Sequence, residues 1–249
     1  MRSNCTNNKS NRSAQASLYG WLEEGPFTLA LSAGFFGFYA HAGIVSVFSE
    51  LGLKPKRILG CSAGALVGGL WSAGMSPDAM KAALFNLTRS DFWDPGIGFG
   101  LLRGQKFAHV LQRLIGEPKI ESLPTQFASC VFNVRHRRTE FINSGSLEKA
   151  IRASCALPGL FQPVKIDNHW FLDGGILDRL AMSNCSPDER VLAIALPSQS
   201  RPRQQLNEFA SEAHRVLKAP KFTRVNPFQL DMGAVAYHEG REWALSLIS

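Results

Sequence analysis

The sequence predicts an α/β fold, a three-layer sandwich with a mostly parallel central sheet. Apolar runs at residues 27–32 and 57–60 are typical of buried parallel strands. A small-residue turn and a helical stretch follow each run, and this alternation favours right-handed crossovers between parallel strands. The 249 residues are 45% hydrophobic and contain no internal repeat or linker. We therefore expect one domain over residues 26–249, preceded by a flexible polar tail at residues 1–25.

The first half of the domain contains the helices that follow these strands. Helices are expected at residues 38–52, 63–73, from 77 onward and 105–115. Gly52 and Gly74 stand where helix C-caps are needed, and Ser76 has the residue type of an N-cap. Residues 90–104 combine glycines with apolar side chains and read as a loop, which either packs on the core or forms a mobile apolar lid.

The second half is expected to complete the sheet and cover it. The predicted elements are strands at 126–134 and 138–143, a helix at 146–154, a hairpin across 164–172, a strand at 191–196 and helices at 203–218 and 233–248. Basic residues at 135–138 indicate a solvated turn between two of the strands. His41 lies on an apolar helix and is expected to be a packed core residue.

Composition narrows the class of protein. The formal net charge of +7 is scattered along the chain, which favours a solvated basic surface or contact with anionic lipid, and no nucleic-acid partner is expected. The five cysteines include no Cys-x-x-Cys pair, which indicates reduced thiols. The histidines are spread singly, so neither a metal nor a cofactor is expected. No signal peptide or transmembrane run is visible, which predicts a protein of the cytoplasm or the membrane periphery.

The most informative stretch is Gly60-Cys61-Ser62-Ala63-Gly64, at the junction of a strand and a helix. The Gly-x-Ser-x-Gly pattern is that of a nucleophile elbow. A serine at such a turn occupies a strained backbone region, and its small neighbours let adjacent elements approach closely. Ser62 is therefore a candidate nucleophile, with Gly60 and Gly64 required by the turn.

A further loop is expected at the same edge of the sheet, because the carboxyl ends of parallel strands lie together, and a second loop could present a carboxylate toward that edge. The first loop spans Ser32 to Gly37, and its backbone N–H groups could stabilise an oxyanion. The candidate oxyanion-hole residues are Ala33, Gly34 and Phe35. The second loop is Asp173-Gly174-Gly175, whose glycines allow a tight turn that presents the carboxylate of Asp173.

In combination, these segments resemble the patatin-like phospholipase family from about residue 27 to the C-terminus. The segments that carry the resemblance are Leu-Ala-Leu-Ser at 29–32, the glycine loop, Ala-His-Ala-Gly at 40–43, the elbow, Ala-Ser-Cys-Ala-Leu-Pro-Gly-Leu-Phe at 153–161 and Asp-Gly-Gly at 173–175. The resemblance implies a lipid acyl hydrolase with a Ser–Asp dyad and no catalytic histidine. Ser62 would be the nucleophile, Asp173 the base, and lipid or phospholipid the substrate, with contact at the membrane periphery.

This chain departs from the family in the first loop, which usually reads Gly-Gly-Gly-x-Arg/Lys-Gly. Gly34 and Gly37 match, but Ser32 and Ala33 replace glycines and Phe36 replaces the basic residue. The backbone N–H groups remain, provided that φ stays negative at the two positions that gain a Cβ. The lost positive charge is expected to change head-group preference or lower activity.

Two other functions are consistent with the same residues. An α/β-hydrolase esterase would use a Ser–Asp–His triad, with His214 or His238 following Ser62 and Asp173 in the required chain order. Both histidines fall in predicted helices rather than in loops after strands, which argues against this reading. A catalytically inactive patatin-like domain that binds lipid or protein is the other alternative, favoured by the altered glycine loop.

Overall fold

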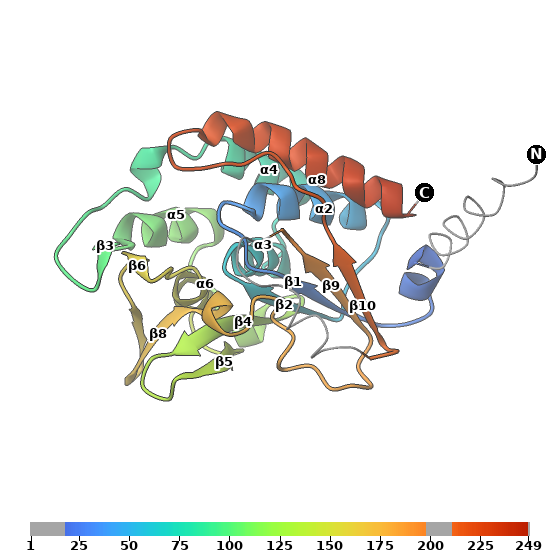
Figure 1. The fold of residues 1–249 in the computed structure, drawn as a ribbon, viewed down its shortest axis with the longest axis horizontal. Coiled ribbons are helices and arrows are strands. Elements are labelled where there is room, and N and C mark those ends of the chain that lie inside the picture. The colour runs from blue at the N-terminus through green and yellow to red at the C-terminus, as the bar shows by residue number, and fades with distance from the viewer. Residues whose placement is uncertain (1–17, 198–210, 249) are drawn as a thin grey trace, which may run out of the picture.

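The computed structural model describes residues 18–197 and 211–248 and confirms a mixed α/β fold with a mostly parallel central sheet (Figure 1). Five parallel strands form its centre in the order β10 (His214–Lys218), β9 (Val191–Ala195), β1 (Thr28–Leu31), β2 (Arg57–Cys61) and β4 (Gln126–Asn133). Beyond β4 the sheet becomes antiparallel, through β5 (Arg138–Ile142), β8 (His169–Asp173) and β7 (Val164–Ile166). The elbow and the first glycine loop therefore follow neighbouring parallel strands.

Alternate residues of the central strands face two different layers. Leu29 and Leu31 belong to the larger core, which packs under the helices. These helices are α2 (Phe38–Glu50), α3 (Ala63–Ser72), α4 (Pro77–Phe85), α5 (Gln105–Ile115), α6 (Leu147–Ser154) and α8 (Gly233–Ile248). Ala30 faces the opposite side and packs with Leu180 and Met182, so a segment without helices covers that face in the part of the chain that is described.

Helices α2 and α8 lie close together along the top of the molecule (Figure 1). Their contact depends on small residues. A Cβ added at Gly43 would lie 2.0 Å from the carbonyl oxygen of Tyr237, and one at Gly240 would lie 2.5 Å from that of Ala40. Each glycine thus lets the backbone of one helix touch the other.

The structure corrects three expectations about local structure. Residues 18–23 are helical rather than part of a flexible tail, and Leu18, Trp21 and Leu22 are buried in the core. Residues 214–218 form strand β10 rather than the end of a helix, because the backbone pairs with β9 at the sheet edge. The expected loop at 90–104 contains a short strand, β3 (Gly100–Leu102), which pairs with β6 (Gly159–Phe161). The rest of the predicted tail and residues 203–210 lie outside the described residues.

The structure also bears on the expectations for His41, for the cysteines, for metal-binding groups and for membrane-spanning helices. His41 is fully buried, as predicted for a core histidine. Cys61, Cys130, Cys155 and Cys185 are free thiols, and Cys5 lies outside the described residues. Within the described ranges, the side chains form no group of His, Cys, Asp or Glu that could hold a metal ion. No helix in these ranges is long and apolar enough to cross a membrane.

Candidate active site

The turn between β2 and α3 holds Ser62 in an unusual backbone conformation, with φ 53° and ψ −117°. The flanking glycines are required by contacts with neighbouring backbone. A Cβ at Gly60 would lie 2.5 Å from the Cα of Ala65, and one at Gly64 would lie 2.1 Å from the carbonyl oxygen of Leu31. The small residues therefore let strand, turn and helix pack tightly enough to hold the serine in this strained geometry.

Ser154, at the end of α6, ties the elbow to the neighbouring strand. Its hydroxyl accepts a 2.8 Å hydrogen bond from the backbone N–H of Ser62 and donates a 2.6 Å bond to the carbonyl oxygen of Cys130. The Sγ of Cys155 lies 3.3 Å from the carbonyl oxygen of Ser62. Both backbone polar groups of Ser62 thus have partners outside the turn, which leaves its side chain as the group directed into the site.

Asp173 ends strand β8 and lies beside Ser62. Its carboxylate accepts a 2.8 Å hydrogen bond from the backbone N–H of Gly175, and the Ser62 side chain is close enough to lower the pKa of the carboxyl. The side chain is 4% exposed, and this burial raises the pKa of the Asp173 carboxyl above its usual value. The hydrogen bonds and the positive charge of Arg179 oppose the shift. A buried carboxylate with a raised pKa is a stronger proton acceptor than an ordinary aspartate.

The loop after β1 is fixed by bonds that involve its non-glycine residues. The hydroxyl of Ser32 accepts a 2.9 Å hydrogen bond from the backbone N–H of Leu196, and its carbonyl oxygen lies 2.9 Å from Nε2 of His41. Ser32 and Ala33 are absent from the residues with positive φ, so their Cβ atoms are accommodated. The serine that replaces a family glycine thus connects the loop to the end of β9.

One of the three expected oxyanion-hole donors already has a hydrogen-bond partner within the protein. The backbone N–H of Ala33 donates a 2.8 Å hydrogen bond to the carbonyl oxygen of Arg179, so it is not available to a substrate. The guanidinium of Arg179 in turn donates to the carbonyl oxygen of Ala33 at 3.2 Å. Among the described residues, the N–H groups of Gly34 and Phe35 have no hydrogen-bond partner, and both residues line the cavity described below. These two N–H groups remain the candidates.

Phe36 occupies the loop position where the family usually has a basic residue. It has a positive φ of 54°, which is unfavourable for a bulky side chain. Its ring packs against those of Phe35, Phe38 and Phe92, with centroids 4.9, 5.5 and 5.7 Å away. The substitution therefore makes this wall of the site apolar and aromatic.

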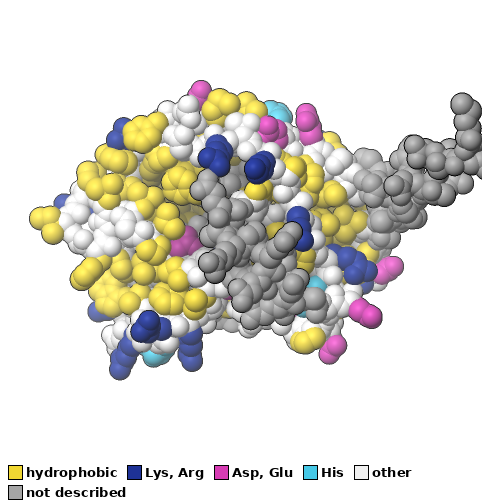
Figure 2. All heavy atoms as spheres, in the orientation of Figure 1, with side chains coloured by type: hydrophobic (Ala, Val, Ile, Leu, Met, Phe, Trp, Pro, Cys, Tyr) yellow, Lys and Arg dark blue, Asp and Glu magenta, His cyan; other side chains and the backbone are white. Residues whose placement is uncertain are grey.

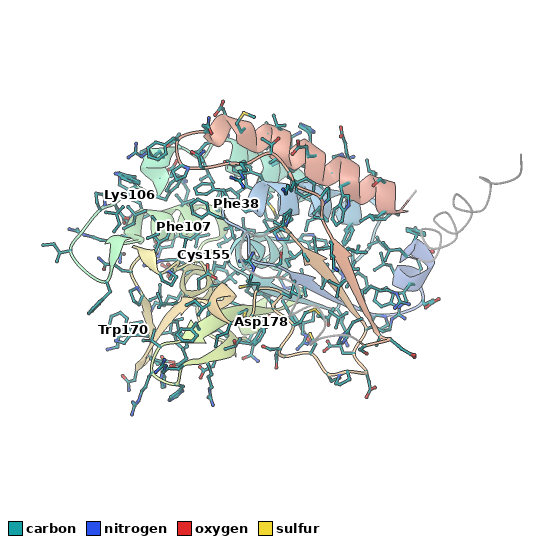
Figure 3. The ribbon with its side chains drawn as sticks, viewed as in Figure 1. Phe38, Lys106, Phe107, Cys155, Trp170 and Asp178 are labelled. Carbon is teal, nitrogen blue, oxygen red and sulfur yellow. The ribbon has the colours of Figure 1, made fainter. Side chains whose placement is uncertain are left out.

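Ser62 and Asp173 open into a cavity of about 460 Å³. Its lining is mostly apolar and comes from α2, α3, α5, the 87–93 segment and the 155–161 segment. Figure 3 labels three lining residues, Phe38, Phe107 and Cys155, which come from three of these elements. Burial raises the pKa of the Cys155 thiol well above its usual value, so this cysteine is protonated at neutral pH. The cavity has the shape and chemistry to hold an apolar chain beside the serine.

The histidine alternatives are not brought to this site. Among the described residues, no histidine lines the cavity that contains Ser62 and Asp173. His214 lies in β10 and bonds to the carbonyl oxygen of Ser186, and His238 is exposed on α8. The described side chains that line this cavity therefore include a serine and an aspartate but no histidine.

Comparison with known protein families gives a match over more than half of the chain. The model of the family described as "Patatin-like phospholipase" matches residues 29–183, which include Ser62 and Asp173. The chain belongs to the patatin-like phospholipase family.

Individual relatives agree with this assignment. Uncharacterised NTE family proteins of Mycobacterium bovis and Mycobacterium tuberculosis are 34% identical over 171 residues, which are 68% of this chain and 48% of theirs. The chain thus spans about half the length of these relatives. A lysophospholipase of Emericella nidulans is 27% identical over 154 residues, 58% of this chain and 10% of that protein. The crystal structure of VipD from Legionella pneumophila shares the fold, with a TM-score of 0.66 and 15% identity over 90% of this chain and 66% of VipD.

Two residues at the site were not identified from the sequence. Ser154 lies in the 153–161 segment that carried the family resemblance, but nothing in a single sequence indicates that its hydroxyl supports the elbow. Arg179 follows the Asp-Gly-Gly turn by a few residues and reaches the first glycine loop. Its proximity in sequence to Asp173 was the one available signal.

Proposed function

We propose that this protein hydrolyses fatty-acyl ester bonds of lipids, with Ser62 as nucleophile and Asp173 as general base. The observation that carries the proposal is that Ser62, in its strained turn, and the buried carboxylate of Asp173 line the same apolar cavity. The family supports a lipid ester hydrolase, and the lysophospholipase name of a relative agrees with it.

In the proposed reaction, the Ser62 Oγ attacks the ester carbonyl carbon while Asp173 accepts the hydroxyl proton. Negative charge develops on the carbonyl oxygen, near the N–H groups of Gly34 and Phe35. Collapse of this intermediate expels the alcohol, which takes the proton from Asp173, and leaves an acyl-enzyme. Water, deprotonated by Asp173, then releases the fatty acid and restores Ser62. Such preorganised N–H donors typically contribute about 3–4 kcal/mol each to transition-state stabilisation.

Substitution of the two side chains tests the proposal. Ser62→Ala and Asp173→Asn should each lower kcat for a lysophospholipid by about 10³-fold or more, because the nucleophile or its base is lost. A fluorophosphonate probe should label the native protein and fail to label Ser62→Ala. Ser183→Ala and Asp188→Asn are matched controls, because both side chains are exposed and do not line the cavity. Full turnover in Asp173→Asn would exclude the dyad, and a folded native protein that neither turns over lipid nor takes the label would favour a binding module.

We also propose that the site meets its lipid at a membrane surface. Apolar side chains are exposed around the cavity mouth and on the loop before β3, namely Phe35, Ile97, Phe99, Leu101, Leu157, Ile176 and Leu177. Figure 2 shows hydrophobic side chains gathered on the left of this face, over β3, β6 and α5 of Figure 1. An exposed apolar patch of this kind typically marks a contact surface.

A further inference from the structure

A second cavity lies on the other side of the first glycine loop. Its volume is about 970 Å³, and it shares Gly34, Phe35, Phe36 and Arg179 with the cavity that contains Ser62. The segment between β10 and α8 forms its opposite wall, through residues 221–226. Figure 1 shows this segment crossing the front of the molecule on its way to α8. The loop that carries the candidate oxyanion donors is therefore the partition between two cavities.

The two cavities differ in charge. Three basic side chains line the second cavity, those of Arg179, Lys221 and Arg224, and the described lining residues include no Asp or Glu. Lys221 and Arg224 are exposed, and neither forms an ion pair within the described ranges. The carboxylate of Glu239 accepts hydrogen bonds from the backbone N–H and the hydroxyl of Thr223, which lines this cavity. We call this second cavity the basic cleft.

An ester lipid has two unlike ends on either side of the carbonyl that the serine attacks. If the carbonyl oxygen lies at the N–H groups of Gly34 and Phe35, the acyl chain fits the apolar cavity of about 460 Å³. The alcohol side of the ester then faces the partition and the basic cleft. Guanidinium and ammonium groups that line a cleft without lining carboxylates favour a phosphate group there.

We propose that the basic cleft, through Lys221 and Arg224, is the site that binds the head-group phosphate when a glycerophospholipid presents its acyl ester to Ser62. This inference rests on the proposed ester hydrolysis at Ser62. The positive charge that Phe36 removes from the loop is supplied here by Lys221 and Arg224, which stand on a different segment of the chain. Arg179 has a different role. Its hydrogen bond to the carbonyl oxygen of Ala33 positions the loop that lies between the two cavities.

The test compares two substrates with the same acyl chain, palmitoyl glycerol phosphate and palmitoyl glycerol. The double variant Lys221→Gln/Arg224→Gln should raise KM for the phosphorylated lipid about tenfold, since each partly exposed charge contributes a few-fold. The kcat for that lipid and both constants for palmitoyl glycerol should stay unchanged. The control is Lys54→Gln/Lys56→Gln, which removes two exposed charges that line neither cavity. Equal effects on the two lipids, or no effect on either, would overturn the proposal.

Two further experiments are needed. The first distinguishes a head-group phosphate from free phosphate as the ligand of the cleft, and the second tests the cleft independently of hydrolysis. If inorganic phosphate inhibits the native protein but KM for palmitoyl glycerol phosphate is the same in the double variant, the cleft binds free phosphate and the head-group proposal is wrong. Equilibrium binding of both lipids is measured in Ser62→Ala, which cannot turn over. A preference for the phosphorylated lipid there, lost on adding the double substitution, supports the cleft even where the native protein hydrolyses neither lipid. Equal binding of the two lipids to Ser62→Ala would overturn the proposal that the cleft binds the head-group phosphate.

Discussion

At the scale of single residues, the buried carboxylate of Asp173 should lower the stability of the fold, although the proposed reaction requires it. Burial raises its pKa, so the charged form that can accept a proton is disfavoured in the folded state. The folded protein then binds this proton more tightly than the unfolded chain does. By linkage, stability falls as pH rises from the usual aspartate pKa through the raised value, and the penalty is complete above it.

Asp173→Asn should therefore raise Tm at pH 7 while it removes activity. Asparagine keeps an oxygen that can accept the bond from the N–H of Gly175 but carries no buried charge. The gain should shrink as pH falls below the folded pKa, where the native carboxyl is already neutral. Thermal unfolding of both proteins between pH 4 and pH 8 measures the effect, with the exposed Asp188→Asn as control. A lower Tm for Asp173→Asn at pH 7 would contradict this account.

How much of the site could be predicted depends on whether its determinants are local. Motifs at the ends of two strands were enough to predict that Ser62 and Asp173 lie at the same site, and both residues line one cavity. The engagement of the Ala33 N–H could not be predicted, because its partner is the carbonyl oxygen of Arg179, which is 146 residues away in the chain. The same holds for Ser154, whose two bonds join the elbow to β4.

At the scale of elements, helices with clear ends in the sequence were predicted within a few residues. The bounds of α5 and α8 agree with the expected ranges, and α4 begins at Pro77 with Ser76 as its cap. Strand β10 was not predicted, because the five residues from His214 have little strand pattern of their own and gain their backbone partners from β9. Edge strands of this kind are specified by the sheet rather than by local propensity.

The contact between α2 and α8 makes an element-scale prediction. Gly43→Ala and Gly240→Ala each place a Cβ within 2.5 Å of a carbonyl oxygen on the other helix, so the two helices must separate. Each should lower the free energy of unfolding by about 1–3 kcal/mol, the usual effect of overpacking. Denaturant titration measures this. Gly20→Ala is the matched control, because nothing lies within 4 Å of its added Cβ, and it should be neutral or stabilising. If neither alanine lowered the free energy of unfolding, the close packing of the two helices would not depend on these glycines.

At the scale of the whole molecule, charge and apolar surface would both act on the membrane contact that we propose. The net charge of +7 should attract the protein to anionic vesicles over distances set by the Debye length, which is about 10 Å at 0.1 M salt. The exposed apolar side chains around the cavity mouth and on the loop before β3 act only on contact. The most exposed of them are Ile97 and Phe99, on the loop before β3. The two contributions can therefore be separated by salt and by substitution.

Ile97→Ser/Phe99→Ser should weaken partition into vesicles of phosphatidylglycerol and phosphatidylcholine about tenfold, at low and at high salt alike. Full burial of one such side chain contributes about 1.5–3 kcal/mol, so partial insertion of two accounts for a factor of this size. Raising the salt concentration should weaken the partition of the native protein and of the variant by the same factor, because the substitutions do not change the net charge. Leu51→Ser/Val235→Ser, which removes exposed apolar side chains that line neither cavity, is the control. Sedimentation with vesicles measures partition. If the first variant bound as tightly as the control, the loop would not insert, and attraction of the basic surface would have to account for membrane contact alone.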